Sequence, residues 1–256
     1  MVTRYSINDV VSYADEYLDV KRIQDDPRAL NGLQVENSGR LSSIAAAVDA
    51  CQATIDAAAA CGASLLVVHH GMFWGGLERL DGRHGRRVRT LHSADVALYS
   101  SHLPLDCHAE VGNNPLLARD LGLHDVVALR GGAAAGPAIG VWGTADATRE
   151  QVVGRLRTKL GVQPRVIAAG PSTVRRVAVV TGAGASELRV ARDVGVDTFV
   201  TGEVAHQVYF DAEEWGINLV LGGHYATETV GVQALAAHLA RRFGVDWRFL
   251  DHPTGL

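Results

Sequence analysis

The sequence predicts a layered α/β/α protein, because short apolar runs typical of buried strands alternate with helical segments along the whole chain. Its 256 residues suffice for one large or two small domains with a buried core. A glycine- and alanine-rich stretch, Gly131–Pro137, interrupts the pattern, which then restarts. We therefore expect two α/β domains, with strands that are largely parallel.

The first half of the chain is expected to open with a helix that runs to about Leu18, with Ser6 as its N-cap and Asp9 in the capping-box position. Pro104 disfavours regular structure, so a loop is expected over 102–106. The other elements expected here are strands at 44–48, 64–68 and 96–100, and an alanine-rich helix at 51–61. The arginine-rich stretch Arg83–Arg89 is interpreted as a solvated loop, with an anionic ligand or a subunit contact as the alternatives.

The second half repeats the alternation of strands and helices. We expect strands at 177–180, 198–200 and 217–221, and helices at 148–160, 185–194 and from about 227 to 243. The glycine turn within Val179–Ser186 is faintly similar to nucleotide-binding turns, but Glu187 occupies the third glycine position, so close packing of strand and helix explains it better. The expected domains are residues 1–130 with 223–256, and residues 131–222.

Composition excludes several classes of protein. The net charge of −4 argues against nucleic acid as a partner, because phosphate binding needs a clustered positive field. No apolar run approaches the roughly 18 residues of a membrane span, and the N-terminus has no signal-peptide core. The three cysteines, Cys51, Cys61 and Cys107, are too few for a disulfide framework. These features predict a cytoplasmic protein without a membrane partner.

Metal-ligating side chains follow three of the expected strands at their carboxyl ends, where parallel sheets gather their ligands. The residues that follow these strands are His69, His70, His102, Asp106 and His224. Glu228 comes four residues after His224, so both side chains are expected on one face of a helix. This spacing suits shared coordination of a metal ion.

Imidazole and carboxylate groups without thiolates favour divalent zinc, iron, manganese, nickel or cobalt. His69 and His70 are adjacent on an extended segment and are expected to point to opposite sides, which suits two ions better than one. Asp106 and Glu228 are the candidates for bridging a metal pair about 3.5–4 Å apart. Taken alone, Glu228 with the histidine before it could instead be an ordinary pair at a helix N-terminus, and His102 a polar loop residue.

Several motifs together carry a family resemblance. They are Val67–Trp74 with its HHG sequence, Ser101–Asp106, Gly112–Asn114, Thr201–Glu203, Gly223–Glu228 with its GHYATE sequence, and Asn31–Val35 near the start. The chain resembles the Nif-three-like dinuclear-metal family, often labelled GTP cyclohydrolase I type 2 homologs, over nearly its whole length. Gln207 departs from the pattern, because many relatives have a second histidine there, after His206. Glu203 and His206 are therefore expected outside the ligand set.

The resemblance implies two divalent metal ions per chain, held between the two α/β domains. The implied ligands are His69, His70, Asp106, His224 and Glu228. It also implies a homohexameric ring, built as a trimer of dimers.

For function, the expected class is a metal-dependent hydrolase of a small molecule, in which a metal-activated water attacks and His102 or Glu203 moves protons. Cys107 is weighed as a nucleophile, but no base is specified for it. The alternatives are a metal-storage or chaperone protein, and a ring-shaped regulatory or interaction scaffold in which the metals are structural.

Overall fold

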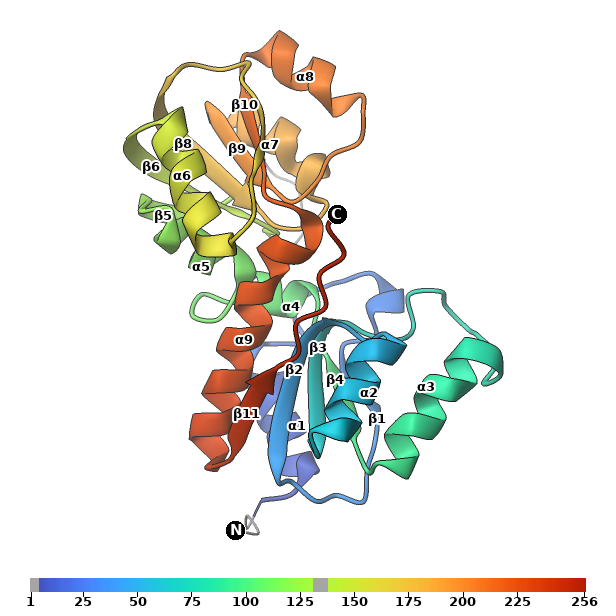
Figure 1. Cartoon of the computed structure of the whole chain (residues 1–256). Coiled ribbons are helices and arrows are strands. Elements are labelled where there is room, and N and C mark those ends of the chain that lie inside the picture. Colours follow the sequence, from blue (N-terminus) through green and yellow to red (C-terminus); the bar gives the residue numbers. More distant parts are fainter. Residues whose placement is uncertain (1–4, 131–137) are drawn as a thin grey trace. The chain divides into compact units, whose positions relative to one another are not determined.

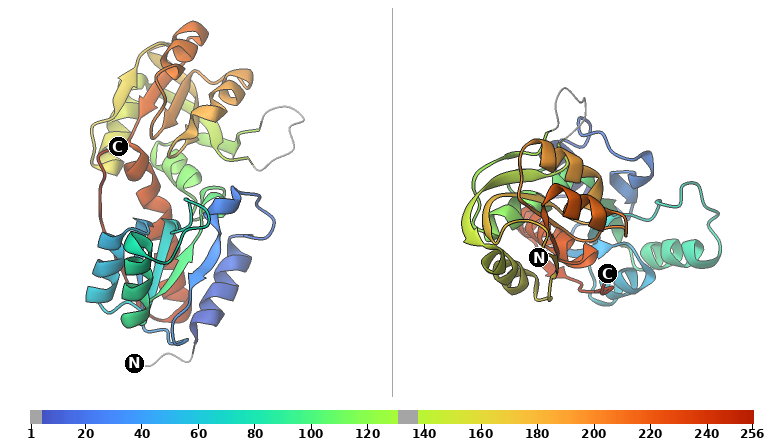
Figure 2. Two further views of the ribbon diagram at one scale, coloured as in Figure 1. Left: turned by 90° about the vertical axis from the view of Figure 1, so that its right-hand side faces the viewer. Right: turned by 90° about the horizontal axis from the view of Figure 1, so that it is seen from above.

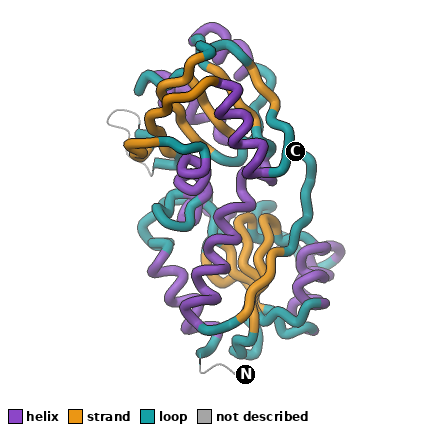
Figure 3. Tube along the Cα trace, turned by 60° about the vertical axis from the view of Figure 1, so that its left-hand side comes forward, coloured by secondary structure: helices purple, strands orange, loops and turns teal. Residues whose placement is uncertain are grey.

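The computed structural model describes residues 5–130 and 138–256 of the chain. The chain forms two compact units: unit 1 is Met1–Leu105 with Gly231–His252, and unit 2 is Asp106–Val230 with Pro253–Leu256. Each unit has its own sheet flanked by helices (Figures 1 and 3), which confirms the predicted α/β class.

The bounds of the two units differ from the domain bounds expected at 130 and 222. The glycine- and alanine-rich stretch 131–137, expected to be the domain junction, lies outside the described residues. The strands on either side of it, β5 (His124–Ala128) and β6 (Val141–Thr148), pair with each other in one sheet. The segment from Asp106 to the stretch therefore groups with unit 2, together with the start of helix α9 (His224–Phe243).

Unit 1 is built on a five-stranded sheet of order β1-β4-β3-β2-β11. Its strands are β1 (Gly32–Val35), β2 (Ser43–Asp49), β3 (Leu65–His70), β4 (Ala97–Ser100) and β11 (Asp246–Phe249). Only β1 is antiparallel to its neighbour, so β2, β3 and β4 end at the same edge of the sheet. Its helices are α1 (Ile7–Tyr17), the 3-10 helix η1 (Pro27–Ala29), α2 (Gln52–Ala60), α3 (Gly82–Ser93) and the part of α9 from Gly231 onward.

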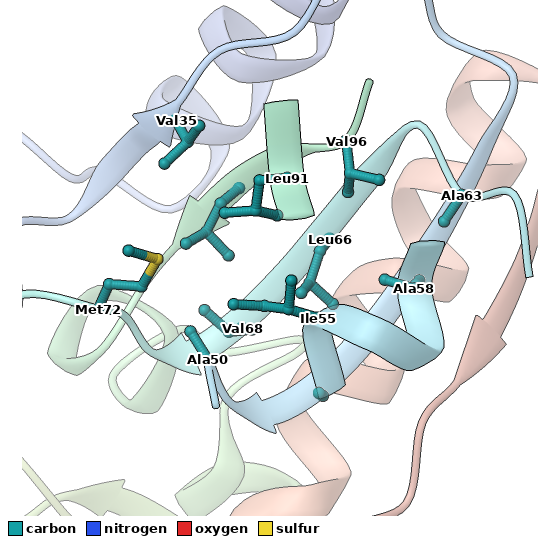
Figure 4. Close-up of a cluster of buried hydrophobic side chains, with 13 residues drawn as sticks. Val35, Ala50, Ile55, Ala58, Ala63, Leu66, Val68, Met72, Leu91 and Val96 are labelled. Atoms are coloured by element: carbon teal, nitrogen blue, oxygen red, sulfur yellow. The ribbon is translucent and has the colours of Figure 1, made fainter. Parts of the chain in front are cut away.

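The core of unit 1 lies on both faces of this sheet. Helices α2 and α3 cover one face and α1 lies on the other (Figure 2). Ile55 of α2 and Leu91 of α3 belong to the same buried cluster as Leu66 and Val68 of β3 (Figure 4). The predicted capping box is confirmed, because the Ser6 amide donates to the Asp9 carboxylate at 2.7 Å and the Ser6 side chain caps the helix.

Unit 2 is built on a six-stranded sheet of order β5-β6-β8-β9-β10-β7. Its further strands are β7 (Arg165–Ile167), β8 (Thr173–Val180), β9 (Thr198–Thr201) and β10 (Asn218–Leu221). Its helices are α5 (Asn113–Asp120), α6 (Arg149–Leu160), η2 (Gly184–Glu187), α7 (Leu188–Asp193), α8 (Val208–Trp215) and the start of α9. Strands β8, β9 and β10 are parallel, whereas β5, β6 and β7 pair antiparallel, so the sheet is mixed rather than largely parallel.

Side chains of β8 alternate between the two faces of this sheet, as the period of an extended strand requires. Val177 and Val179 belong to a buried cluster that includes residues of α5 and α6. Ala178 and Val180 belong to a second cluster with residues of α7 and α8. Unit 2 is therefore layered α/β/α.

Three local expectations were wrong. The arginine-rich stretch lies in helix α3 rather than in a loop, because its arginines at 83, 86 and 89 are exposed while Leu91 is buried on the other side. Pro104 lies in a short helix, α4 (Leu103–Asp106), since proline is tolerated in the first helical turn. The helix expected at 185–194 is divided into η2 and α7. Among the described residues, no helix is long and apolar enough to cross a membrane.

Candidate metal centre

Three imidazoles lie together in unit 1, at the carboxyl ends of two neighbouring parallel strands. His69 and His70 end β3, and His102 follows β4. The ring centroids of His69 and His70 are 4.6 Å apart, and that of His102 lies 5.0 Å from the first and 5.6 Å from the second. The indole ring of Trp74 meets His102 edge-on at 4.8 Å.

The alternation of a regular strand led us to expect that the two adjacent histidines point to opposite sides. The structure contradicts this expectation. Their rings are tilted by 44° and lie side by side at the end of β3. His69 is 0% exposed, and His70 is half-buried. Ligand atoms of both histidines lie within 4.8 Å of each other and of a ligand atom of His102. The strand end therefore brings both imidazoles to one place.

Each of these imidazoles has an oxygen beside its Nδ1 atom. The carbonyl oxygen of Ser101 is 3.0 Å from Nδ1 of His69. The carboxylate of Asp49, which stands opposite His70 in the pairing of β2 with β3, is 2.9 Å from Nδ1 of His70. The Asp25 carboxylate is 2.9 Å from Nδ1 of His102.

Asp25 is itself held in place by the loops around it. Its Oδ2 accepts hydrogen bonds from the Asn31 side chain at 2.8 Å and from the Leu103 amide at 2.9 Å. Burial alone would raise the pKa of Asp25. The hydrogen bond to His102 and the charge of His102, together with the hydrogen bonds from Asn31 and Leu103, outweigh burial and hold the pKa below its usual value. Asp25 is therefore a charged acceptor at neutral pH.

In unit 2, His224 at the start of α9 lies between two carboxylates. Its Nδ1 is 2.8 Å from Glu203, in the loop after β9, and its Nε2 is 3.3 Å from the Glu228 carboxylate one turn along the helix. The hydrogen bond to Glu228, followed by the charge of Glu228 and the contact with Glu203, raises the pKa of His224 to about 9 despite its partial burial. Glu228 is buried, and Glu203 is partly exposed.

Asp106, the first residue of unit 2, is buried among hydrogen-bond donors. The Asn113 amide donates to its Oδ1 at 2.8 Å, and the Thr181 hydroxyl donates to the same oxygen at 3.3 Å. The Thr181 amide in turn donates to Asn114 at 2.8 Å. The Gly112–Asn114 motif therefore orients the Asp106 carboxylate and the turn after β8.

The turn after β8 also contacts the start of α9. The Gly182 amide donates to the Thr227 hydroxyl oxygen at 3.0 Å. Gly182 has a φ of +62°, and a Cβ atom there would collide with a carboxylate oxygen of Glu228 and lie 3.2 Å from Nε2 of His224. Only glycine combines this backbone conformation with such a close approach.

The donor set fits divalent metal ions. The three imidazoles of unit 1 have Nδ1 engaged with an oxygen, which is the arrangement that orients histidines as metal ligands through Nε2. Unit 2 offers buried carboxylates at Asp106 and Glu228 and an imidazole at His224. Imidazole and carboxylate groups of this kind could hold zinc, manganese, iron, cobalt or nickel.

The structure divides the residues singled out in the sequence into two sets. His69, His70 and His102 lie together in unit 1, whereas Asp106, Glu203, His224 and Glu228 belong to unit 2. His206, expected just outside the ligand set, packs its ring edge-on against Phe210 at 5.5 Å. The thiol of Cys107 donates to the carbonyl of Ala138 at 3.2 Å.

Sequence reasoning missed three residues of these sets. Asp49 had a usable signal, because it ends a strand that lies beside β3 and is parallel to it. Thr181 likewise follows directly on the buried strand β8. Asp25 carries no such signal, since it lies in a loop 77 residues before its partner His102.

Comparison with known proteins gives consistent matches over nearly the whole chain. A family model described as Duf34/NIF3 (NGG1p interacting factor 3) matches residues 5–254. A protein of Deinococcus radiodurans named GTP cyclohydrolase 1 type 2 homolog is 41% identical over 251 residues, which cover 97% of this chain and 94% of the relative. A Halobacterium salinarum protein of the same name is 45% identical over 258 residues and covers 98% and 99%. The crystal structure of TTHA1606 from Thermus thermophilus is 43% identical, has a TM-score of 0.90, and covers 98% of this chain and 100% of that chain.

Proposed function

Because the chain belongs to the Duf34/NIF3 family, we propose that it is a metal-dependent hydrolase that binds two divalent metal ions. The proposed ligands are His69, His70, Asp106, His224 and Glu228. The observation that carries the proposal is the oxygen atom that lies 2.8–3.0 Å from Nδ1 of each proposed histidine ligand, His69, His70 and His224. We call this Nδ1 atom the outer nitrogen. Histidines with a satisfied outer nitrogen are typical of metal ligands.

Divalent ions held by these side chains would supply Lewis-acid activation of water for attack on a substrate. Asn113 and Thr181 both donate to Oδ1 of Asp106 and so fix the orientation of that carboxylate. Glu203 reaches Nδ1 of His224 with one oxygen while its side chain remains 47% exposed. Glu203 can therefore hold a proton at His224 and exchange it with solvent.

The substrate class is inferred from the relatives' names and from the ligand chemistry. The relatives are named GTP cyclohydrolase 1 type 2 homologs, so GTP is the first small molecule to test. A panel of phosphoesters and amides would follow, because metal-activated water attacks each of these bonds. The protein would be stripped with chelator and reloaded with zinc, manganese, iron, cobalt or nickel in turn.

Asp106→Asn, with Cys107→Ala beside it as the control, tests the mechanism. Asp106→Asn should lower hydrolysis by more than about 100-fold, because loss of a ligand exceeds the 10–100-fold typical of outer partners. Cys107→Ala should retain activity, since its thiol is engaged with the Ala138 carbonyl. Circular dichroism would verify that both variants fold. Activity that survives chelation and Asp106→Asn but is lost with Cys107→Ala would reject the metal-dependent mechanism.

A further inference from the structure

Helix α3 presents a row of positive charges to solvent. Arg83, Arg86 and Arg89 follow one another at intervals of three residues, so they lie along one face of the helix, and all three are exposed. The Arg83 guanidinium has a carboxylate partner, because it lies 3.6 Å from Glu78. Among the described residues, the guanidinium groups of Arg86 and Arg89 have no such partner. Like charges at this spacing repel one another, so an anion beside them would be stabilising.

Arg86 and Arg89 line a groove between α2 and α3, two helices that lie side by side in unit 1 (Figures 1 and 2). The groove has a volume of about 490 Å³, which is enough for a small molecule. Its other lining residues are Gln52 and Asp56 of α2, and Thr90, Ser93 and Ala94 at the end of α3. None of these residues belongs to the candidate metal centre.

The groove offers hydrogen-bond donors that no protein group takes up. The Gln52 side chain donates to Oγ1 of Thr90 at 3.1 Å, which leaves the hydroxyl hydrogen of Thr90 available. The hydroxyls of Thr90 and Ser93 donate to no acceptor among the described residues. Two guanidinium groups and two hydroxyls are the donors that phosphate oxygens accept from, and arginine binds phosphate through two parallel hydrogen bonds.

Asp56 is the carboxylate that lines this groove, and it does not neutralise the two arginines. Its Oδ1 accepts from the Gln52 side chain at 2.8 Å, and it forms no ion pair with Arg86 or Arg89 among the described residues. Two cations therefore share the groove with one carboxylate. The groove keeps a net positive charge.

A groove of unit 2 provides a comparison, because it is also lined by basic side chains. Of its three cations, Lys159 pairs with Asp120 at 2.7 Å, and Arg155 donates to the carbonyl of Leu121 at 2.6 Å. Only Arg157 is left for an anion there. The α3 groove differs because both of its arginines are available.

We propose that the groove between α2 and α3 binds the phosphate groups of a small molecule that carries a polyphosphate chain, with Arg86 and Arg89 as the anion ligands. Thr90 and Ser93 add hydroxyl donors. The Cβ atoms of arginines three residues apart on a helix are about 5–6 Å apart, so each arginine can hold a different phosphate group. This inference goes beyond the proposed function, because it needs neither a metal ion nor hydrolysis.

The test is a calorimetric titration of the full-length, metal-free protein with inorganic tripolyphosphate, in buffer without divalent ions. We expect saturable binding of one tripolyphosphate per chain, weakened by added salt because exposed charges are screened. The double variant Arg86→Gln, Arg89→Gln should bind at least about 10-fold more weakly, since hydrogen bonds to charged groups are lost.

The control double variant, Arg22→Gln with Arg241→Gln, removes the same charge from unit 1 at two other exposed positions. Arg22 follows α1, and Arg241 lies in the last turn of α9. Because distant exposed charges are screened, this variant should bind tripolyphosphate within about twofold of the unchanged protein. Circular dichroism would verify that both double variants fold. Equal weakening in the two would reduce the effect to general attraction by a basic surface and would overturn the proposal.

Asp56→Asn gives an arm of opposite sign, which a damaged fold cannot imitate. It removes the negative charge from the groove, while the asparagine oxygen can still accept from Gln52, so tripolyphosphate should bind more tightly. Unchanged affinity in Asp56→Asn, or no saturable binding by the unchanged protein, would overturn the assignment. So would a double variant at Arg86 and Arg89 that alters sedimentation but not tripolyphosphate affinity, because those arginines would then form a subunit contact. None of these results bears on metal-dependent hydrolysis, since the titrations contain no metal.

Discussion

The carboxylates beside His224 differ in what they can contribute. Glu228 is 3% exposed and approaches Nε2, whereas the Glu203 side chain is 47% exposed and approaches Nδ1. A buried carboxylate beside an imidazole is costly to leave without a cation, and an exposed one is solvated. We therefore propose Glu228 as a ligand and Glu203 as an outer partner.

Glu228→Gln should accordingly weaken metal retention more than Glu203→Gln. Glu228→Gln removes a proposed ligand. Glu203→Gln removes only the partner of Nδ1 of His224, and the loss of such an outer partner typically lowers metal affinity by about 10–100-fold. Elemental analysis after dialysis against a weak chelator measures the ions retained per chain. Equal losses in the two variants would contradict the assignment.

The metal-free protein should lose stability as the pH rises through the pKa of His224. Hydrogen bonding to Glu228 raises that pKa to about 9 in the folded chain, against 6.5 as the ordinary value. The protonated ring thus stabilises the fold fully below about pH 6.5, and this contribution disappears as the pH rises through about 9. Urea unfolding in chelator at pH 6.5 and 9.5 should show a larger fall for the unchanged protein than for His224→Gln. Parallel pH profiles would contradict the proposed ion pairing.

Strand ends explain which site residues could be predicted from the sequence. His69, His70 and His102 follow apolar strands, and their meeting in unit 1 agrees with the rule that ligands gather at carboxyl ends. Asp25 could not be predicted, because its position depends on a loop between α1 and η1 rather than on a strand. The orientation of His70 was also beyond a simple alternation rule, which fails where the regular strand ends.

At the scale of elements, the turn between β8 and η2 links the parts of the unit 2 site. Thr181 contacts Asp106, and the next residue, Gly182, contacts Thr227 at the start of α9. A strand end, a helix start and a buried carboxylate are therefore positioned by two consecutive residues. These contacts explain why residue 182 is a glycine, so the turn need not be a nucleotide-binding turn.

Gly182→Ala should impair metal binding as well as stability. The new Cβ would collide with Glu228, and the backbone would keep a φ of +62°, which costs a non-glycine residue about 1–2 kcal/mol. Gly161→Ala is the matched control, because it has a φ of +69° with no atom within 4 Å of the added Cβ. Gly182→Ala should lose at least as much stability as Gly161→Ala in urea unfolding, and only Gly182→Ala should bind cobalt more weakly. Equal cobalt affinities would show that the turn does not position the site.

Strands that are continuous apolar runs could be predicted from the sequence, and strands without such a run could not. The strands β2, β3, β4, β8, β9 and β10 were all predicted, because each is an apolar run buried on both faces. The edge strands β1, β5, β7 and β11 were missed, and so was the internal strand β6, since none of them is a continuous apolar run buried on both faces. The antiparallel pairings of β5, β6 and β7 make the sheet of unit 2 mixed.

At the scale of the whole molecule, several large apolar side chains lie on the surface of the described residues. Leu77 is fully exposed, Leu80 is about two-thirds exposed, and Phe210 and Val127 are each about half exposed. Exposed apolar groups that adjoin one another are typical of surfaces that contact another protein. They suit a chain that buries further area against copies of itself.

We expect the protein to assemble as a hexamer, a trimer of dimers, as its resemblance to the family implies. Closed symmetric rings are common among homo-oligomers, and stable subunit contacts bury apolar side chains such as Leu77. Sedimentation velocity at micromolar concentration with metal present should show one dominant species near six times 27.2 kDa. Leu77→Asp tests whether the surface around Leu77 takes part in the subunit contacts. Its control is Glu150→Asp, a conservative change at an exposed helix start. A monomer in the unchanged, metal-loaded protein would contradict the hexamer, because a closed ring with stable contacts would not dissociate at that concentration.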